Sequence, residues 1–466
     1  MTEQMQFERA RFRLIVTRRT ASEVLLLRNA SSWQLPCVEI PVGARPAEYL
    51  VAGVRGKHEI DAYCLWTGGA VEPCTHSTTD RFAFMEARSD QREDAAHRWV
   101  PRNVILSETD VPPLDRDLIR VALDELDRYS AQPELAPFAR PAWIEELLSW
   151  AQSQLDPLGA RPTGKILQLN ASATFSLIRL ETTGAAVWFK ATGAPNAHER
   201  AITVTLHDLF PRYVPRTLAV HPSWNGWLYE EAPGLALGDC QGVEAWARAA
   251  RALAELEISS VMHTPTLLRS GCKDLNLPTV LQQVDPFLAR MRELMARQTK
   301  SSPTAISDAQ MDALGERLVG AIDELQSLHL PATLGHRDLN SQNIVVSLTR
   351  CCFLDWAEGC VTHPLFTFEY LREHAQRSVC RSDDLLEEML GAYLRPWQAL
   401  FTRETLLRAL EISPLLAVIT YAVGGDKWRS SAVLESPALA GFLRSLTRRA
   451  WREAERLAVR STRCPV

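Results

Sequence analysis

The sequence predicts an α+β protein built of three successive regions: an α/β module, a small β-rich region and a mostly helical region. Short apolar runs bounded by turn residues recur between residues 11 and 86 and again between residues 165 and 230, which is the pattern of strands. Residues 236–466 contain long segments with apolar residues at helical spacing. With 466 residues, the chain is long enough for two or three domains.

Composition and charge narrow the class of protein. Hydrophobic residues make up 46% and charged residues 23% of the chain, as in soluble globular proteins. A net charge of −5 gives no reason to expect nucleic acid or a membrane as partner. The amino-terminal stretch lacks the apolar core of a signal peptide. The longest apolar run, Pro414–Val423, is too short to cross a bilayer. We therefore expect a buried helix there and a cytoplasmic protein.

The ten cysteines contain no C-x-x-C pair, so a zinc site is not expected. Cys351 and Cys352 lie in an apolar run and are expected to be buried small hydrophobes.

Residues 1–130 are predicted to form a separate module. The predicted strands and helices are Arg11–Thr17, Glu23–Arg28, Tyr49–Glu59 (helix), Ala62–Trp66, Arg81–Glu86 and Asp115–Tyr129 (helix). This order, with Trp33-Gln34-Leu35-Pro36 after the second strand, resembles the Nudix hydrolase fold. That fold binds Mg²⁺ through a helix carrying R-E-x-x-E-E, whereas the matching stretch here, Arg55–Ile60, lacks two of the three carboxylates. We expect a structural, dimerising or ligand-sensing module, through which a homodimer could form, and not an active pyrophosphohydrolase.

Residues 131–160 are predicted to be a linker followed by a docking helix. Pro133, Pro137 and Pro141 stiffen the approach. The helix Ala142–Leu155 has one apolar face, which we expect to dock the first module onto the second region. Five strands and one helix are then predicted at Lys165–Asn170, Thr174–Leu180, Ala185–Lys190, His198–Phe210 (helix), Val214–Val220 and Gly226–Glu230.

Helices dominate the remaining chain. They are predicted at Val243–Ile258, Ser307–Leu328, Glu369–Gln376, Asp383–Arg395, Thr405–Leu410 and Pro437–Arg460. One flank of the last helix carries five arginines, at positions 444, 448, 449, 452 and 456. Such a run is interpreted as a solvated face, with an acidic partner as the alternative.

The stretch Leu334–Leu365 carries the chemistry. Asp338 and Asn343 lie on a polar loop just before the β-branched run Ile344–Val346. A second apolar run, Cys351–Leu354, ends on Asp355, so a hairpin would bring Asn343 and Asp355 together. Amide and carboxylate oxygens suit Mg²⁺, and Asp338 could accept a proton from an attacking hydroxyl.

The segment His336-Arg337-Asp338, with Asn343 and then Leu354-Asp355-Trp356, resembles the catalytic segment of the aminoglycoside phosphotransferase and choline kinase-like family. The resemblance covers roughly residues 160–400. It implies a bilobal protein-kinase-like fold, with a β-rich amino-terminal lobe and hinge over residues 161–235 and a helical carboxy-terminal lobe over residues 236–466. It also implies transfer of phosphate from ATP, with Mg²⁺, to a hydroxyl of an aminoglycoside, amino alcohol, sugar or related metabolite.

The same resemblance assigns roles to residues outside that segment. Lys190 ends the strand V-W-F-K and would contact the ATP phosphates. Glu199 would orient Lys190, with Glu230 and Glu231 as alternatives. Glu230 to Gly234, including Ala232, would form the hinge whose backbone faces adenine.

One departure from the family pattern leaves a second function open. The loop Asn170–Thr174 contains no glycine, although kinase nucleotide loops often use it to approach the phosphates closely. The alternative is therefore a catalytically silent nucleotide-binding regulatory protein. The acceptor stays undetermined: a cationic one would need an acidic pocket, and Glu358, Glu369, Asp383 and Asp384 are near the motif in sequence.

Overall fold

The computed structural model describes residues 9–29, 32–68, 81–88, 94–108, 110–378 and 383–463. The chain forms two compact units, the first made of Met1–Arg200 and Arg216–Glu231, the second of Ala201–Pro215 and Ala232–Val466. One change of unit falls between Glu231 and Ala232, inside the predicted hinge. The predicted module of residues 1–130 and the strands predicted after residue 160 are both in the first unit, and a separate module stays a prediction.

A seven-stranded mixed sheet forms the early part of the first unit. The strand order is β3-β2-β1-β6-β5, with β4 also paired to β1 and β7 to β2, and β1 runs parallel to β6. The elements are β1 (Arg9–Thr17), β2 (Glu23–Asn29), β3 (Ser32–Gln34), β4 (Cys37–Pro41), α1 (Pro46–His58), β5 (Ala62–Gly68), β6 (Arg81–Ala87), β7 (His97–Pro101), α2 (Arg102–Ile105) and α3 (Pro113–Ala131). The predicted strands and helices all appear, and the apolar residues Ile119, Ala122, Leu123 and Leu126 of α3 are buried.

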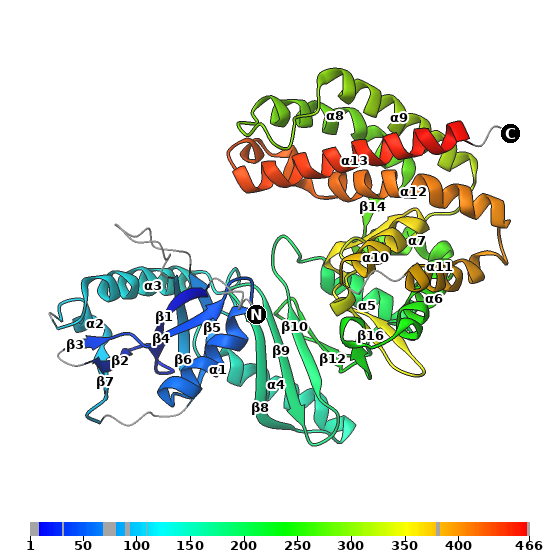
Figure 1. Ribbon diagram of the computed structural model, residues 1–466. Helices are drawn as coiled ribbons and strands as arrows, with labels where there is room; N and C mark the ends of the chain where they lie inside the picture. Colours follow the sequence, from blue (N-terminus) through cyan, green and yellow to red (C-terminus); the bar gives the residue numbers. More distant parts are fainter. Residues whose placement is uncertain are drawn as a thin grey trace, which may run out of the picture. The chain divides into compact units, whose positions relative to one another are not determined.

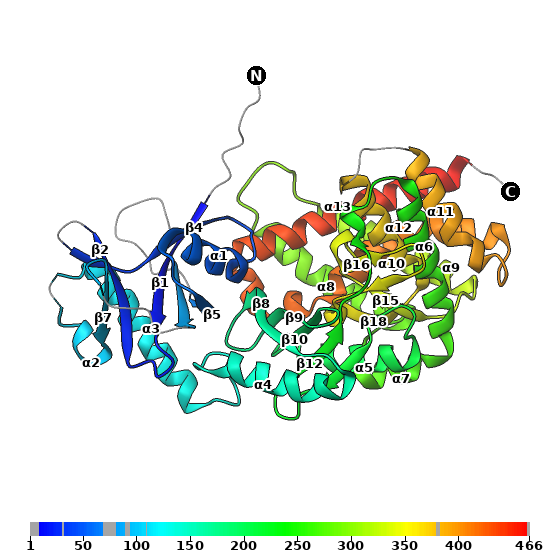
Figure 2. The ribbon, with the colours of Figure 1, turned by 90° about the horizontal axis from the view of Figure 1, so that it is seen from below.

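A five-stranded antiparallel sheet with the order β11-β12-β10-β9-β8 forms the later part of the first unit. Its strands are β8 (Pro162–Ala171), β9 (Ser176–Thr182), β10 (Val187–Ala191), β11 (Thr217–Val220) and β12 (Gly226–Glu230). Helix α4 (Trp143–Leu155) lies along this sheet in both views (Figures 1 and 2). Its buried Trp143, Ile144 and Leu147 share one apolar core with Ile178 and Phe189.

Two buried polar side chains join these parts of the first unit. The Gln168 amide on β8 accepts a hydrogen bond from the Cys64 N–H and donates one to the Cys64 carbonyl, both at 2.9 Å. It thereby satisfies backbone groups of β5, which ends its sheet. The Glu86 carboxylate on β6 accepts from the Ala142 N–H at 2.8 Å, directly before α4. The predicted docking helix thus packs on the second sheet and is hydrogen-bonded to the first.

The second unit is mainly helical. Helix α5 (Glu199–Leu209) begins in the first unit and continues into this one. The other helices are α6 (Val243–Ser260), α7 (Thr264–Ser270), α8 (Leu277–Ala296), α9 (Asp308–Ser327), α10 (Pro364–Ser378), α11 (Asp383–Trp397), α12 (Arg403–Gly424) and α13 (Pro437–Arg463). Helices α12 and α13 lie side by side, and α11 packs on α6 (Figure 1). Helix α9 starts with a capping box between Ser307 and Gln310. Its apolar residues Met311, Leu314, Leu318, Ile322 and Leu325 are buried.

Two small sheets complete the second unit. One has the order β13-β16-β17 and the other β14-β18-β15. Their strands are β13 (Leu235–Ala236), β14 (Lys273–Leu275), β15 (Thr333–His336), β16 (Ile344–Val346), β17 (Cys351–Phe353) and β18 (Gly359–Thr362). Strands β16 and β17 form the hairpin predicted from the sequence, with Ile344 opposite Phe353.

Three helices of the second unit differ from the prediction, among them the short α7, which was not predicted. Helix α8 was not predicted, and it contains Pro286 in its interior. Helix α12 joins the predicted helix Thr405–Leu410 to the apolar run Pro414–Val423, across Pro414. A proline inside a helix costs about 3 kcal/mol or more, and we attribute the tolerance of Pro414 to burial, since nearly every residue from Ile412 to Gly424 is buried.

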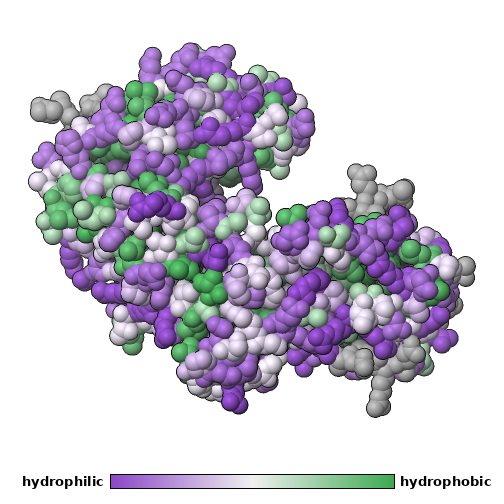
Figure 3. All heavy atoms as spheres, turned by 180° about the vertical axis from the view of Figure 1, so that it is seen from behind, coloured by the Kyte–Doolittle hydropathy of each residue, from purple (hydrophilic) through white to green (hydrophobic). Residues whose placement is uncertain are grey.

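By length and composition, α12 is the one helix of the described chain that could cross a membrane. However, 67% of its apolar window is buried inside the protein, where it contacts α10 and α13. The burial is that of a core helix. The face of the protein drawn in Figure 3 is mostly hydrophilic with scattered hydrophobic patches.

Candidate active site

His336 ties the loop that carries Asp338 to the strand that precedes Asp355. Its ring is buried at the end of β15. The Nε2 atom donates to the Leu354 carbonyl at 3.0 Å, and the Nδ1 atom accepts from the Asp338 N–H at 3.2 Å. These two contacts are compatible with one neutral tautomer, protonated on Nε2. Both ring nitrogens of His336 therefore form hydrogen bonds that hold the loop.

Asp338 and Asn343 are joined by direct contacts. The Asn343 Nδ2 atom donates to the Asp338 backbone carbonyl at 2.9 Å, and the Asn340 Nδ2 atom lies 3.3 Å from Asp338 Oδ1. The turn between them is closed by Asn340, whose side chain accepts from the Gln342 N–H. Asp338 itself is exposed, so its carboxylate is positioned by the loop and accessible to a substrate.

Asp355 lies at the same end of the hairpin as Asn343. The Leu354 N–H donates to the Asn343 carbonyl at 2.8 Å, one residue before Asp355. Asp355 has a left-handed backbone, with φ 62° and ψ 62°, and an exposed side chain. A non-glycine residue in this conformation stores strain of about 1–3 kcal/mol, which is typical of functional sites. The prediction that the hairpin brings these two residues together agrees with this geometry.

The chemistry of Asn343 and Asp355 fits a hard cation. Because Asn343 Nδ2 is held by the Asp338 carbonyl, the amide presents its oxygen as the remaining ligand. Asp355 adds carboxylate oxygens, the donors that Mg²⁺ prefers alongside water and substrate phosphates. Within the described ranges, no group of three or more His, Cys, Asp and Glu side chains could hold a metal by itself. Asn343 and Asp355 could together supply two protein ligands to such a cation.

Helix α10 supports the loop from behind, and sequence reasoning missed this contribution. Thr367 Oγ1 accepts from the His336 N–H at 3.1 Å, and His374 Nε2 shares a hydrogen bond of 3.0 Å with Ser341 Oγ. Burial lowers the pKa of His374, the positive charge of Arg377 lowers it further, and Asp338 opposes both. No local motif signals these contacts, because their partners are more than thirty residues apart.

In the first unit, Lys190 and Glu199 form a buried ion pair. The Lys190 Nζ atom lies 2.5 Å from Glu199 Oε1, and the side chains are only 8% and 2% exposed. Lys190 is on the central strand β10, opposite Leu177 and Trp227. The two alternative partners are engaged elsewhere: Glu230 pairs with Arg216 and Glu231 with Arg179.

The predicted hinge is anchored by the pair of Glu231 with Arg179. Arg179 donates to both Glu231 oxygens, at 2.6 and 2.9 Å, and this contact lowers the pKa of Glu231. The backbone continues through Ala232, the first residue of that segment in the second unit. The Glu230 N–H donates to the Arg216 carbonyl, and the Glu230 side chain pairs with Arg216. Both contacts of Glu230 are therefore structural.

The glycine-free loop Asn170–Thr174 is closed by Ser172. Its Oγ accepts from the N–H groups of Phe175 at 2.9 Å and Thr174 at 3.3 Å. Serine therefore closes this turn without glycine. Lys190 and Glu199 belong to the first unit, whereas Asp338, Asn343 and Asp355 belong to the second.

Of the acidic residues considered for a cationic acceptor, none with a described side chain lines the cleft beside Asp338. Glu358 is paired with Arg337. Glu369 is 2% exposed in its side chain and is paired with Arg372. The side chain of Asp383 lies outside the described residues, and Asp384 does not line the cleft beside Asp338.

Residues 189–404 match the model of a family described as the phosphotransferase enzyme family. This range, slightly less than half of the chain, includes Lys190, Glu199, Asp338, Asn343 and Asp355. No curated protein matches the sequence.

Solved structures give weaker similarities. An ethanolamine kinase from Plasmodium vivax is 14% identical, with a TM-score of 0.46, and the alignment covers 72% of this chain and 95% of that one. A choline kinase from Cryptosporidium parvum is 11% identical, with a TM-score of 0.47 and coverage of 68% and 97%. A macrolide 2'-phosphotransferase from Brachybacterium faecium is 16% identical, with a TM-score of 0.41 and coverage of 65% and 97%. At these scores the likenesses do not establish a shared fold.

Proposed function

We propose that the protein is a small-molecule kinase, which transfers the γ-phosphoryl group of ATP to a hydroxyl in a Mg²⁺-dependent reaction. The observation that carries this proposal is the arrangement of Asp338, Asn343 and Asp355 at one end of the β16–β17 hairpin, within the range that matches the phosphotransferase family. Phosphoryl transfer needs mainly positioning and charge stabilisation, which such a set of oxygens can supply.

Asp338 is assigned as the base, or as the group that orients the acceptor. Its carboxylate is exposed and its position is set by His336 through the backbone and by Asn343 through the carbonyl. It would accept the proton of the acceptor hydroxyl as that oxygen attacks the γ-phosphorus. His336 is a positioning residue, since both ring nitrogens are engaged within the loop.

Asn343 and Asp355 would hold Mg²⁺, which when bound neutralises the negative charge of the ATP phosphates. Lys190 would bind the phosphates, and Glu199 would hold Lys190 in place, as their buried contact allows. The backbone from Glu230 to Ala232 would contact the adenine. The bilobal protein-kinase-like fold is part of this proposal, with a β-rich region before residue 231 and a helical region after it.

The second candidate is a nucleotide-binding regulator that transfers no phosphate. It is favoured by the glycine-free loop Asn170–Thr174, in which Ser172 closes the turn. The presence of Asp338, Asn343 and Asp355 argues against it, because the groups proposed for transfer have not been lost.

We also propose that residues 1–130 form a Nudix-like module, and that this module has no hydrolase activity. Glu59, the remaining carboxylate of Arg55–Ile60, follows the last residue of α1 and caps it in a left-handed conformation. Lys57 and His58 both contact the Cys37 carbonyl. One carboxylate at a helix end is too few ligands for a metal bound against pyrophosphate.

Replacement of Asp338 tests the proposed reaction. We expect Asp338→Asn to lower kcat by about 10²–10⁴-fold, the usual contribution of a general base, while the thermal midpoint stays unchanged because the side chain is exposed. Product formation from Mg²⁺–ATP with a panel of hydroxyl acceptors provides the measurement. Asp323→Asn, at an exposed carboxylate on α9, is the matched control. Turnover by Asp338→Asn equal to that of the control would refute the assignment.

A further inference from the structure

A cleft of about 460 Å³ opens beside Asp338, wholly within the second unit. It is bounded by the loop that carries Asp338 and by residues of α10, α12 and α13. This volume falls in the usual range of small-molecule sites, about 300–1,000 Å³. A cleft that contains the proposed base is the place where an acceptor would bind, so the side chains that line it define the chemistry of that acceptor.

The lining is rich in positive charge. Four arginines line the cleft, Arg337, Arg377, Arg449 and Arg452, against two carboxylates, Asp338 and Glu373. Arg337 is neutralised by Glu358, which is its ion-pair partner. Within the lining, the remaining three arginines are accompanied by Asp338 and Glu373, and outside the lining Glu453 and Glu369 also act on Arg449.

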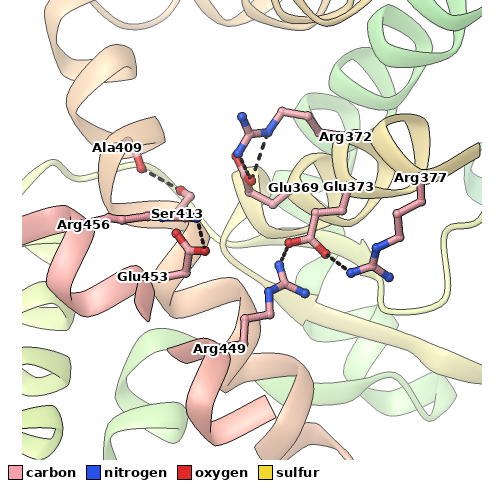
Figure 4. A network of polar contacts seen from close by, with 9 residues as sticks. All are labelled: Glu369, Arg372, Glu373, Arg377, Ala409, Ser413, Arg449, Glu453 and Arg456. Atoms are coloured by element: carbon pink, nitrogen blue, oxygen red, sulfur yellow. Dashed lines mark hydrogen bonds and ion pairs between the residues drawn. The ribbon is translucent and has the colours of Figure 1, made fainter. Parts of the chain in front are cut away.

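Glu373 is shared between two of these arginines. Figure 4 shows its carboxylate between Arg377, on the same helix α10, and Arg449, on α13. Arg377 lies 3.4 Å away and is 70% exposed in its side chain, whereas Arg449 is 23% exposed. One carboxylate cannot neutralise two guanidinium groups, so this network keeps a net positive charge at the wall of the cleft.

Arg452 adds a further positive charge one turn along α13. Its side chain is exposed, and among the described residues it has no ion pair. It also lines a neighbouring cleft of about 490 Å³, together with Lys300, Arg444 and Arg448, and that lining contains no carboxylate. Arg444 and Arg448 donate to the carbonyls of Leu294 and Thr304, contacts that leave their charge in place. The positive surface thus continues from Asp338 along α13.

A cationic acceptor does not suit this lining. Exposed Tyr421 and Phe442 also border the cleft, and aromatic faces can bind cations. However, a cation placed among Arg377, Arg449 and Arg452 would be repelled by all three, and like charges in close contact cost several kcal/mol. The two aromatic rings can instead pack against the apolar face of a ring or chain.

We propose that the acceptor of this kinase is an anionic alcohol, which carries a phosphate or carboxylate group bound by Arg449 and Arg452 while its hydroxyl lies at Asp338. This inference rests on the proposed function and names the substrate class of the same site. Guanidinium groups bind both anions through paired, charge-assisted hydrogen bonds. In the reaction, the acceptor oxygen bonds to the γ-phosphorus, the bond to the β–γ bridging oxygen breaks, ADP leaves and Asp338 takes the hydroxyl proton.

The first experiment compares acceptors that differ in charge. Full-length protein with Mg²⁺–ATP is assayed with glycerol, glycerol 3-phosphate, glycerate, ethanolamine and kanamycin. We expect kcat/KM for an anionic member to exceed that for glycerol by at least about tenfold, the worth of one charge-assisted hydrogen bond. Glycerol 3-phosphate and glycerate separate a phosphate from a carboxylate requirement. A preference for ethanolamine or kanamycin would overturn the inference of an anionic acceptor, but it would support the proposed kinase activity.

The second experiment measures anion binding and does not depend on the choice of acceptor. Pyrophosphate is titrated calorimetrically into protein saturated with ADP, and the variants Arg452→Gln and Arg456→Gln are compared. Arg452 lines the cleft. Arg456 is on the same helix, does not line the cleft and is paired with Glu453. We expect Arg452→Gln to weaken binding about tenfold and Arg456→Gln to leave it within about twofold.

Two results of the titration would overturn the inference. One is the absence of pyrophosphate binding by the wild-type protein, and the other is equal binding by Arg452→Gln and Arg456→Gln. Both leave the kinase proposal to be judged by Asp338→Asn, so the two failures are distinguishable. An increase in Kd with salt is also expected, because exposed charges are screened over about 10 Å at 0.1 M salt.

Discussion

At the scale of single residues, the pair of Lys190 and Glu199 is the most buried charged contact of the candidate site. Both side chains are less than a tenth exposed, and their charged atoms lie 2.5 Å apart. Removing two charges from water is costly, and their attraction roughly offsets this cost. The pair is therefore weak as a source of stability, and its geometry is better explained by the need to hold Lys190 in one position.

Removal of one partner should reveal this balance. We expect Lys190→Met to lower the free energy of unfolding by about 3–5 kcal/mol, because the buried Glu199 loses its cation. The double variant Lys190→Met/Glu199→Met should recover most of that loss, since apolar replacement of both partners is often neutral. Urea unfolding provides the measurement, with Lys165→Met at an exposed position of β8 as control. A single variant as stable as the double variant would contradict this account.

Most residues of the candidate site could be predicted from the sequence because their contacts are local. Asp338, Asn343 and Asp355 lie within one loop and one hairpin, and Lys190 is nine residues from Glu199. The roles of Thr367, His374, Arg449 and Arg452 could not be predicted. These residues reach the loop or its cleft only because α10 and α13 pack beside it. The run of arginines on α13 could be seen in the sequence, but which of them line the cleft depends on how α13 packs.

At the scale of elements, α4 shows how a short helix joins two sheets within the first unit. It packs its apolar face on the sheet of β8–β12, and its first turn follows the Ala142 N–H that binds Glu86. Glu86 is 3% exposed, and burial is the main cause that raises its pKa to about 7, against the opposing hydrogen bond from Ala142. This carboxyl therefore titrates near neutral pH in the folded protein.

The raised pKa of Glu86 predicts a pH dependence of stability. Between the ordinary pKa of about 4.5 and the folded value of about 7, the folded state binds more protons than the unfolded state. Stability from this group is thus fully present below pH 4.5 and is lost as pH rises through 7. Glu86→Gln keeps a hydrogen-bond acceptor for the Ala142 N–H. We expect this variant to unfold at a higher urea concentration than wild type at pH 8. We also expect its stability to fall less than that of wild type as the pH rises through 7. Equal pH profiles for the two proteins would contradict the explanation.

Elements whose apolar pattern is regular were predicted well, and elements interrupted by proline were not. The stripes of α3 and α9 lie on the buried faces expected from their spacing. Helices α8 and α12 contain Pro286 and Pro414, which mark helix ends in a sequence taken alone. Burial of the surrounding residues offsets the lost hydrogen bond, and burial is a property of the folded unit.

At the scale of the whole molecule, the candidate functional groups are divided between two compact units. The first contains the Lys190–Glu199 pair, and the second contains the loop and hairpin with Asp338, Asn343 and Asp355. The sequence predicted a β-rich region followed by a helical one, and the unit boundary at Glu231 falls at the predicted hinge. The early sheet belongs to the first unit because Trp66 and Phe84 share one apolar core with Ile178. Gln168 adds hydrogen bonds to that contact, which no periodic pattern indicates.

The most direct test of the central claim is thermal unfolding with ATP, with and without Mg²⁺, for wild type, Asp355→Ala and the control Asp323→Ala. At about 100 times its Kd, a ligand adds roughly 2.7 kcal/mol of stability, which raises the midpoint by a few degrees. We predict a Mg²⁺-dependent rise for wild type and Asp323→Ala that is lost in Asp355→Ala. No Mg²⁺-dependent rise in wild type, or an equal rise in Asp355→Ala, would contradict the assignment of this site.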